Sequence, residues 1–202
     1  MNHWDKKFDS DSYIYGKEAN AFVKEIFKNK TNCQEKVLLL AEGEGRNAIY
    51  LALLGYDVTT YDFSKVGIQK QLKLAEEAQV HIDANYGDIT EPNLVPSRTY
   101  DYTINIFGHV LPEDKERMFD NLIHPLVKNG HSYFELYSLE QLEYGTGGPS
   151  NIDMLYEIEE IRHYLATHSV KIHKLEKNIV ERHEGIGHSG QASVIQGHIE
   201  KI

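Results

Sequence analysis

Two glycines and an acid stand at a spacing that suits the binding of a nucleoside. Residues 41–47 read Ala-Glu-Gly-Glu-Gly-Arg-Asn and directly follow the apolar run 37–40, and Asp62 comes 17 residues after Gly45. Glycine has no Cβ, so its backbone can approach a ligand, and a helix that begins here presents free N–H groups. An acid at the end of the next strand can accept hydrogen bonds from both ribose hydroxyls. The spacing therefore predicts a nucleoside-binding turn.

This turn alone does not identify the ligand. Gly43-x-Gly45-x-x-Ala48 also satisfies the loose dinucleotide motif G-x-G-x-x-G/A. A tight strand-to-helix turn would explain both glycines, but it gives Asp62 no role. A nicotinamide dinucleotide and another nucleoside cofactor therefore both remain open on these residues.

The elements that would position these residues alternate between strand and helix, as is typical of a parallel sheet covered on both faces. Apolar and β-branched runs predict strands at 37–40, 57–61, 80–85, 101–107 and 131–137, and amphipathic patterns predict helices near 47–54, 65–78, 112–129 and 153–166. Two long alternating segments, 170–183 and 191–202, predict an antiparallel hairpin. We expect an α/β fold with a doubly wound, mostly parallel seven-stranded sheet and a C-terminal antiparallel hairpin.

A chain of 202 residues suits one domain with a sizeable core. We expect a single domain over 1–202, with a cofactor-binding half at 35–137 and a substrate-side loop, helix and hairpin at 138–202. Residues 1–34 are rich in aromatic side chains, namely Trp4, Phe8, Tyr13, Tyr15, Phe22 and Phe27. We expect this segment to pack as a cap or lid.

The composition disfavours a nucleic-acid partner, because 31 acids against 21 Lys plus Arg give a net charge of −10 that phosphate backbones repel. No apolar run approaches the ~20 residues that span a bilayer, and the N-terminus lacks the apolar core of a signal peptide. Cys33 is the only cysteine, which fits a reducing compartment. We expect a cytoplasmic protein without a membrane partner; the sequence leaves its oligomeric state open.

Several motifs along the chain are shared with one known family. They are Trp4-Asp5, Tyr13-x-Tyr15-Gly16, LAEGEGRNA at 40–48, IFGH at 106–109, YGTGGP at 144–149, and Glu184-Gly185 followed by His188-x-Gly190-x-Ala192. With the five-stranded core and the hairpin, they resemble the class I S-adenosylmethionine-dependent methyltransferases, in particular the small bacterial tellurite-resistance-type group. The resemblance covers almost the whole chain. It implies a methyltransferase that uses S-adenosyl-L-methionine and releases S-adenosyl-L-homocysteine.

The resemblance also implies cofactor-binding residues at the carboxyl ends of the strands: Glu42, Gly43, Glu44, Gly45, Asn47, Asp62, Phe63, Asp88, Ile89, Ile106 and Phe107. Asp62 would bind the ribose hydroxyls and Phe63 would lie against the adenine. Asp88 would approach the adenine amino group, or it would serve only as the acid of a turn. Many class I enzymes have an acid and a glycine where this chain has Leu39 and Ala41, so we expect Glu42 to supply the carboxylate instead.

Methyl transfer of this kind is an in-line displacement, in which the protein mainly aligns the reacting atoms. A thiol or chalcogen oxyanion needs little help from a base, whereas amines and hydroxyls need more. The chain lacks the Asn/Asp-Pro-Pro-aromatic motif of amino-directed nucleic-acid methyltransferases and a Pro-Cys nucleophile. These absences favour a small-molecule acceptor.

His109, at the end of the fourth strand, is the candidate general base. The alternative is that it is a loop histidine bound to the backbone. Candidate substrate contacts are Tyr13, Tyr15, Tyr137, Tyr144, Arg182, His183 and His188. Ordinary packing of the aromatic residues and an exposed polar turn account for the same side chains. The glycines of 144–149 can present N–H groups to an anion or form a plain flexible connection.

The eleven histidines do not form a recognisable metal motif. His163, His168 and His173 recur every five residues, which does not align them on one helical face. Without a Cys-x-x-Cys or His-Glu-x-x-His pattern, we expect solvated histidines and no metal site. Besides the methyltransferase, a nicotinamide-binding oxidoreductase and a non-catalytic S-adenosylmethionine-binding protein remain as alternatives.

Overall fold

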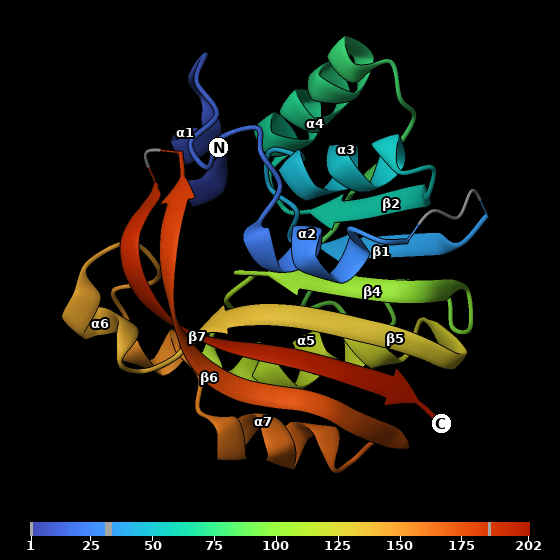
Figure 1. Cartoon of the computed structure of the whole chain (residues 1–202), viewed down its shortest axis with the longest axis vertical. Helices are drawn as coiled ribbons and strands as arrows, with labels where there is room; N and C mark the ends of the chain where they lie inside the picture. The colour runs from blue at the N-terminus through green and yellow to red at the C-terminus, as the bar shows by residue number, and fades with distance from the viewer. Residues whose placement is uncertain (1, 31–33, 186) are drawn as a thin grey trace.

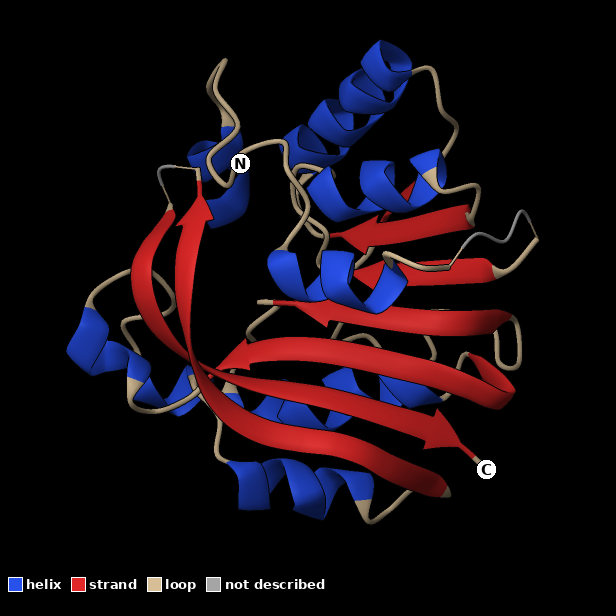
Figure 2. Ribbon diagram, viewed as in Figure 1, coloured by secondary structure: helices blue, strands red, loops and turns tan. Residues whose placement is uncertain are grey.

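A seven-stranded sheet, in the order β3-β2-β1-β4-β5-β7-β6, runs through the molecule with helices on both faces (Figure 1, Figure 2). The structure is a computed structural model that describes residues 2–30, 34–185 and 187–202, so Cys33 lies outside the described residues. The strands are β1 (Lys36–Leu40), β2 (Asp57–Asp62), β3 (Asp83–Tyr86), β4 (Tyr100–Ile106), β5 (Leu126–Tyr137), β6 (Val170–Glu184) and β7 (His188–Lys201). The helices are α1 (His3–Phe8), α2 (Ala21–Phe27), α3 (Arg46–Leu53), α4 (Lys65–Ala78), α5 (Lys115–Ile123), α6 (Gln141–Tyr144) and α7 (Ile158–Leu165), with 3-10 turns η1 (Pro112–Asp114) and η2 (Ile152–Met154).

The strand directions confirm the expected fold. β1 pairs in parallel with β2 and with β4, and the parallel pairing continues to β3 on one side and β5 on the other. β7 pairs antiparallel with both β5 and β6. The chain switches sides of β1 between β3 and β4, and sheets of this kind bind ligands at the carboxyl ends of the strands beside such a switch.

β1 is apolar throughout its buried part because helices cover both of its faces. Leu38 and Leu40 belong to a core cluster with residues of α5 and α7. Val37 and Leu39 belong to a second cluster with residues of α2, α3 and α4. These two layers hold the end of β1 rigidly, which fixes the position of the glycine turn that follows it.

Some boundaries differ from those expected from the sequence. The helix expected to reach residue 129 ends at Ile123, because Pro125 has no N–H to continue the helical hydrogen bonds and its ring would clash with the preceding turn. β5 therefore begins at Leu126 rather than 131 and passes through Asn129, whose φ is +63°. β3 begins at Asp83 rather than 80, since the chain first turns at Gln79 with φ +56°.

Two further differences concern the last third of the chain. The helix expected over 153–166 is divided into η2 and α7, and the short helix α6 was not predicted. The expected hairpin is confirmed, with β6 and β7 paired from Val170 to Glu184. Within the described ranges, no helix combines the length and apolarity that crossing a lipid bilayer requires.

Candidate active site

A cavity of about 690 Å³ opens at the carboxyl edge of the parallel strands. Its walls come from the ends of β1 to β5, from α1, from residues 148–154 and from the tip of the β6–β7 hairpin. The volume lies in the range of roughly 300–1,000 Å³ that is usual for ligand pockets. The expected site residues that line it are Tyr15, Glu42, Gly43, Asn47, Asp62, Phe63, Asp88, Ile89, Ile106, Phe107, His109, Tyr137 and His188.

The turn after β1 is joined to the end of β2 by Asp62. The Gly43 N–H donates to Asp62 Oδ2 at 2.7 Å, and the Ser64 N–H donates to Oδ1 at 2.7 Å. Burial raises the pKa of Asp62 to about 6, in spite of these hydrogen bonds. A carboxylate has about four acceptor positions, so Asp62 can still accept from two hydroxyl groups.

Glu42 satisfies the N-terminal N–H groups of α3, which have no partner within the helix. Its Oε1 accepts from the N–H groups of Asn47 and Ala48 at 2.8 and 2.9 Å. Burial nevertheless raises the pKa of Glu42 to about 7. A ligand that carries a positive charge or hydrogen-bond donors would stabilise the ionised form of this carboxyl group.

Two non-glycine residues beside the cavity have left-handed backbone conformations. Ala41 has a φ of +55° and Phe107 a φ of +60°. This region costs a residue with a Cβ about 1–2 kcal/mol, whereas glycine adopts it freely. Ala41 is one of the two departures from the usual class I pattern, and it adopts a conformation that glycine would adopt without strain.

Four ring systems form one end of the cavity, and we call them the aromatic wall: Tyr15, Phe107, Tyr137 and His188. Phe107 stacks on Tyr137 with ring centroids 4.5 Å apart, and His188 lies 4.4 Å from Tyr15. His188 meets Phe107 edge-on at 5.3 Å. His188 Nδ1 is buried without a hydrogen-bond partner in the described part of the chain, because Glu184 Oε2 is 3.6 Å away.

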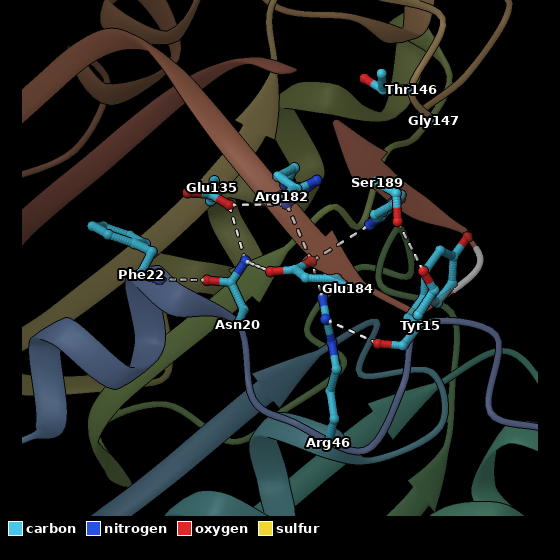
Figure 3. A network of polar contacts seen from close by, with 12 residues as sticks. Tyr15, Asn20, Phe22, Arg46, Glu135, Thr146, Gly147, Arg182, Glu184 and Ser189 are labelled. Carbon is cyan, nitrogen blue, oxygen red and sulfur yellow. Dashed lines mark hydrogen bonds and ion pairs between the residues drawn. The ribbon is translucent and has the colours of Figure 1, made fainter. Parts of the chain in front are cut away.

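Behind the aromatic wall lies a buried network of two arginines and two glutamates (Figure 3). Glu184 Oε2 is 2.9 Å from Arg46 Nη2 and 3.4 Å from Arg182 Nη2. Arg182 is also 3.2 Å from Glu135, and it donates to the hydroxyl of Tyr137 at 2.6 Å. The four formal charges cancel, so the network adds no net charge to the cavity.

Asn20 links this network to the N-terminal segment (Figure 3). Its Nδ2 donates to Glu135 at 3.0 Å and to Glu184 at 3.1 Å, while its Oδ1 accepts from the first N–H groups of α2. Burial would raise the pKa of Glu184, but His188 and the two arginines of the network hold it at about 2. Glu184 belongs to one of the sequence motifs described above. Asn20 and Glu135 lie 115 residues apart, and no motif or spacing in the sequence indicated that they meet.

Both ring nitrogens of His109 are engaged by the backbone. Nδ1 lies 2.8 Å from the carbonyl oxygen of Met154, and Nε2 accepts from the N–H of Tyr137 at 3.1 Å. These partners assign the proton to Nδ1, and burial lowers the pKa of His109 to about 4. The geometry favours the alternative of a backbone-bound histidine, because neither nitrogen is free to take a proton.

The expected site residues that do not line the cavity are Tyr13, Glu44, Gly45, Tyr144, Arg182 and His183. Glu44 accepts from the N–H of Ile14 at 2.8 Å and pairs with Lys70 at 2.7 Å, so it fastens the N-terminal segment. Gly45 begins α3 with a φ of +98°, and a Cβ there would lie 3.0 Å from Gln71.

The remaining residues of that group have other surroundings. Tyr13 donates to the carbonyl oxygen of Lys70 at 3.2 Å and packs against the core. Arg182 lies behind the aromatic wall, and His183 is exposed on β6. Tyr144 is half-buried at the end of α6.

The helix α1 supplies cavity residues that were not among the expected site residues, including Trp4, Lys7 and Phe8. Trp4 stacks on Phe8 at 5.5 Å, and Phe8 approaches the Cβ position of Gly43 to 3.4 Å. Asp5 accepts from the hydroxyl of Ser64 at 2.8 Å, which ties α1 to the start of α4. The sequence feature that pointed to this segment was the aromatic content of residues 1–34. Their role as a lid stays a prediction.

This strand order, with a cavity at the carboxyl edge beside the switch point, is the fold of the class I S-adenosylmethionine-dependent methyltransferases. The family model of the tellurite resistance protein TehB matches residues 3–140. The chain therefore belongs to the TehB family.

Individual relatives agree with this assignment. A 70-residue segment is 37% identical to the probable S-adenosyl-L-methionine-dependent methyltransferase TehB of Haemophilus influenzae, and it spans 35% of this chain and 24% of that relative. The crystal structure of Haemophilus influenzae TehB superposes with a TM-score of 0.72 at 21% identity, over 99% of this chain and 66% of the other. A SAM-dependent methyltransferase of Anabaena variabilis gives a TM-score of 0.71 at 18% identity, over 98% and 92%. At these identities the two structures demonstrate a shared fold.

Proposed function

We propose that the protein is an S-adenosylmethionine-dependent methyltransferase that acts on a small nucleophile, a thiol or a chalcogen oxyanion. The observation that carries the proposal is that one cavity joins the Gly43–Asp62 turn to the aromatic wall. The turn suits a nucleoside, and the aromatic wall suits a small acceptor. Membership of the TehB family supports this function, because its Haemophilus influenzae member is named a probable methyltransferase of this type.

The residues around the glycine turn fit the cofactor. Asp62 would accept from the ribose hydroxyls, and these donors would stabilise a carboxylate whose pKa burial has raised to about 6. Phe63, stacked on Tyr86 at 5.8 Å and 41% exposed, offers a ring face to the adenine. Asp88 Oδ1 accepts from the N–H and hydroxyl of Thr90, which leaves Oδ2 for the adenine amino group.

When bound, S-adenosylmethionine would supply an electrophilic methyl group on a positively charged sulfur. The rings of Phe107 and Tyr137 can stabilise such a cation through their π faces. The chain's own contribution would then be to hold the acceptor in line and exclude water. His109 would act by fixing the backbone of Tyr137 rather than by taking a proton.

The aromatic wall has no group suited to act as a base near neutral pH. Burial lowers the pKa of His188 to about 4 and raises the pKa values of Tyr15 and Tyr137 to about 12. An acceptor that is already an anion at neutral pH needs no base. This favours thiolates and chalcogen oxyanions over amines and alcohols.

Lys7 provides a cation for such an anion. It lines the cavity, lies 4.8 Å from the ring of Trp4 and donates to the hydroxyl of Tyr15 at 2.6 Å. An anionic acceptor bound against Tyr15 would therefore meet the Lys7 ammonium group. The positive charge of Lys7 therefore favours an anionic acceptor over a neutral one.

An acceptor screen with methyl-labelled S-adenosylmethionine tests the proposal. We expect label in small thiols, selenite or tellurite, and none in amines or alcohols of similar size. Transfer to amines or alcohols alone would contradict the proposed acceptor class. Tight cofactor binding without transfer to any acceptor would instead support the non-catalytic alternative.

A further inference from the structure

Three histidines from three neighbouring strands converge on one face of the sheet, far from the cavity. They are His131 of β5, His173 of β6 and His198 of β7, and one ring nitrogen of each lies within 4.8 Å of the others. His198 Nε2 is 3.0 Å from His131 Nδ1, and the rings of His173 and His198 stack with centroids 4.6 Å apart. His198 also stacks on Tyr133, its partner on the neighbouring strand β5, with ring centroids 4.4 Å apart, and this contact orients the His198 ring.

The alternation of side chains along β6 brings His173 into this group, beside an irregularity in the pairing with β7. The antiparallel register passes from Ile172 opposite Ile199 to Lys174 opposite His198, so His173 is an extra residue. Ile199 is buried in the core on the other face of the sheet. Successive side chains of a strand point to opposite faces, so His173, which follows Ile172, lies on the face that carries His198, and the two rings stack there.

The surrounding charges are of both signs. Glu200 Oε2 lies 2.6 Å from His173 Nε2, and Glu35 adds a second negative charge near His131. Lys30 opposes them, since its ammonium group lies 4.6 Å from the ring centroid of Tyr102 and acts on both His131 and His198. A carboxylate beside a ligand histidine is a common feature of metal sites.

We propose that His131, His173 and His198 form a binding site for a divalent transition-metal ion, with Zn²⁺ as the probe. Imidazole nitrogens suit Zn²⁺, Ni²⁺ and Cu²⁺. The ion would replace the hydrogen bond between His131 and His198 with two coordinate bonds, and the ring that donates this hydrogen bond would change tautomer, so that its proton moves to its other nitrogen. The face is open to such an ion, because Figure 2 draws no helix in front of β6 and β7 along this stretch of the described chain.

The site would be structural rather than catalytic. His131 precedes Tyr137 by six residues along β5, which places the site about 20 Å from the aromatic wall. A bound ion would tie β5, β7 and β6 together at the end of the sheet opposite the cavity. The inference is therefore independent of the proposed methyl transfer.

Calorimetry and thermal unfolding of the tag-free full chain with Zn²⁺ test the site. We expect one ion per chain, and a Tm raised by roughly 5–10 °C at a free Zn²⁺ concentration about 100-fold above Kd. His173→Gln and His198→Gln should each weaken binding by at least about tenfold. His163→Gln, at an exposed position of α7, is the matched control and should bind as the unchanged protein does.

Charge variants give a second, independent readout. Lys30→Met should tighten Zn²⁺ binding, because it removes the cation beside the rings, and Glu200→Gln should weaken it. His173 is partly exposed, with 29% of its side chain accessible, so His173→Gln should keep its fold, which circular dichroism checks. Absence of Zn²⁺ binding, or equal affinity in His173→Gln and His163→Gln, would overturn the proposal.

Discussion

The guanidinium carbon of Arg182 lies 3.9 Å from the centroid of the Phe107 ring. Phe107 has a strained backbone with φ +60°, and strain of this kind persists only where the surroundings hold a residue in place. Arg182 is itself fixed by Glu135, Glu184 and the hydroxyl of Tyr137. We infer that the buried network positions the aromatic wall.

Loss of Arg182 should therefore destabilise the protein. Arg182→Met leaves Glu135 without a cationic partner and weakens the pairing of Glu184, so we expect the free energy of unfolding to fall by about 3–5 kcal/mol. Urea denaturation measures this change. Arg162→Met, on α7 with 49% of its side chain accessible, is the control and should change stability by less than about 0.5 kcal/mol. Similar midpoints for the two variants would show that the network contributes little.

Binding of S-adenosylhomocysteine should release protons near pH 6.5. Burial raises the pKa values of Glu42 to about 7 and Asp62 to about 6, so both carboxyls are partly protonated there in the free protein. Ligand donors favour the ionised forms, so affinity should rise from pH 5.5 to 7.5 and proton release should vanish by about pH 8.5. Calorimetry in buffers of different ionisation enthalpy measures the release. An affinity that does not change with pH would contradict these shifts.

The same two carboxyl groups determine how the stability of the free protein changes with pH. Their folded pKa values lie above the ordinary values of 4.5 and 3.8, so their contribution is full below about pH 4. It is lost as the pH rises through 6 and 7, because the folded state then gives up protons that it holds more tightly than the unfolded chain. Asp62→Asn should flatten this loss in denaturation curves recorded between pH 5 and 8.

Lys7 should matter for the acceptor and not for the cofactor. Lys7→Met removes the ammonium group that contacts Tyr15, so we expect kcat/KM for an anionic acceptor to fall by about tenfold. The KM for S-adenosylmethionine should stay unchanged in the same assay. Lys6→Met, one residue away and not part of the cavity lining, is the matched control. An equal loss in both variants would assign the effect to the charge of α1 as a whole.

Ala41→Gly should stabilise the protein. Ala41 has a φ of +55°, and glycine would relieve about 1 kcal/mol of strain there. The same substitution at Ala52, inside α3, should destabilise by about 0.5–1 kcal/mol. Thermal unfolding of the two variants measures opposite shifts in Tm. A lower Tm for Ala41→Gly would mean that Ala41 is not strained.

The fold was predictable where the signal is local. Periodicity and the spacing between Gly45 and Asp62 predicted the parallel core and the position of its ligand turn, and the alternation after residue 170 predicted the hairpin. The end of α5 was missed because Pro125, which has no N–H for the helical hydrogen bonds, ends an otherwise amphipathic pattern.

Contacts between distant parts of the chain were not predictable in this way. The hydrogen bond from Asn20 to Glu135 joins residues that no periodicity relates. The histidine cluster joins three strands whose register the sequence does not specify, and a bulge beside His173 shifts that register by one residue. The backbone contacts of His109 with Met154 and Tyr137 likewise appear only once three distant segments are placed together.

Equilibrium titration with S-adenosylhomocysteine and, separately, with NADH tests the central claim most directly. We predict that S-adenosylhomocysteine binds once per chain and that NADH does not bind. Asp62 is the proposed acceptor of the ribose hydrogen bonds, so Asp62→Asn should weaken the binding by about 10- to 100-fold through loss of its charge. Asp83→Asn, at the exposed start of β3, should bind as tightly as the unchanged protein. Binding of NADH without binding of S-adenosylhomocysteine would contradict the account.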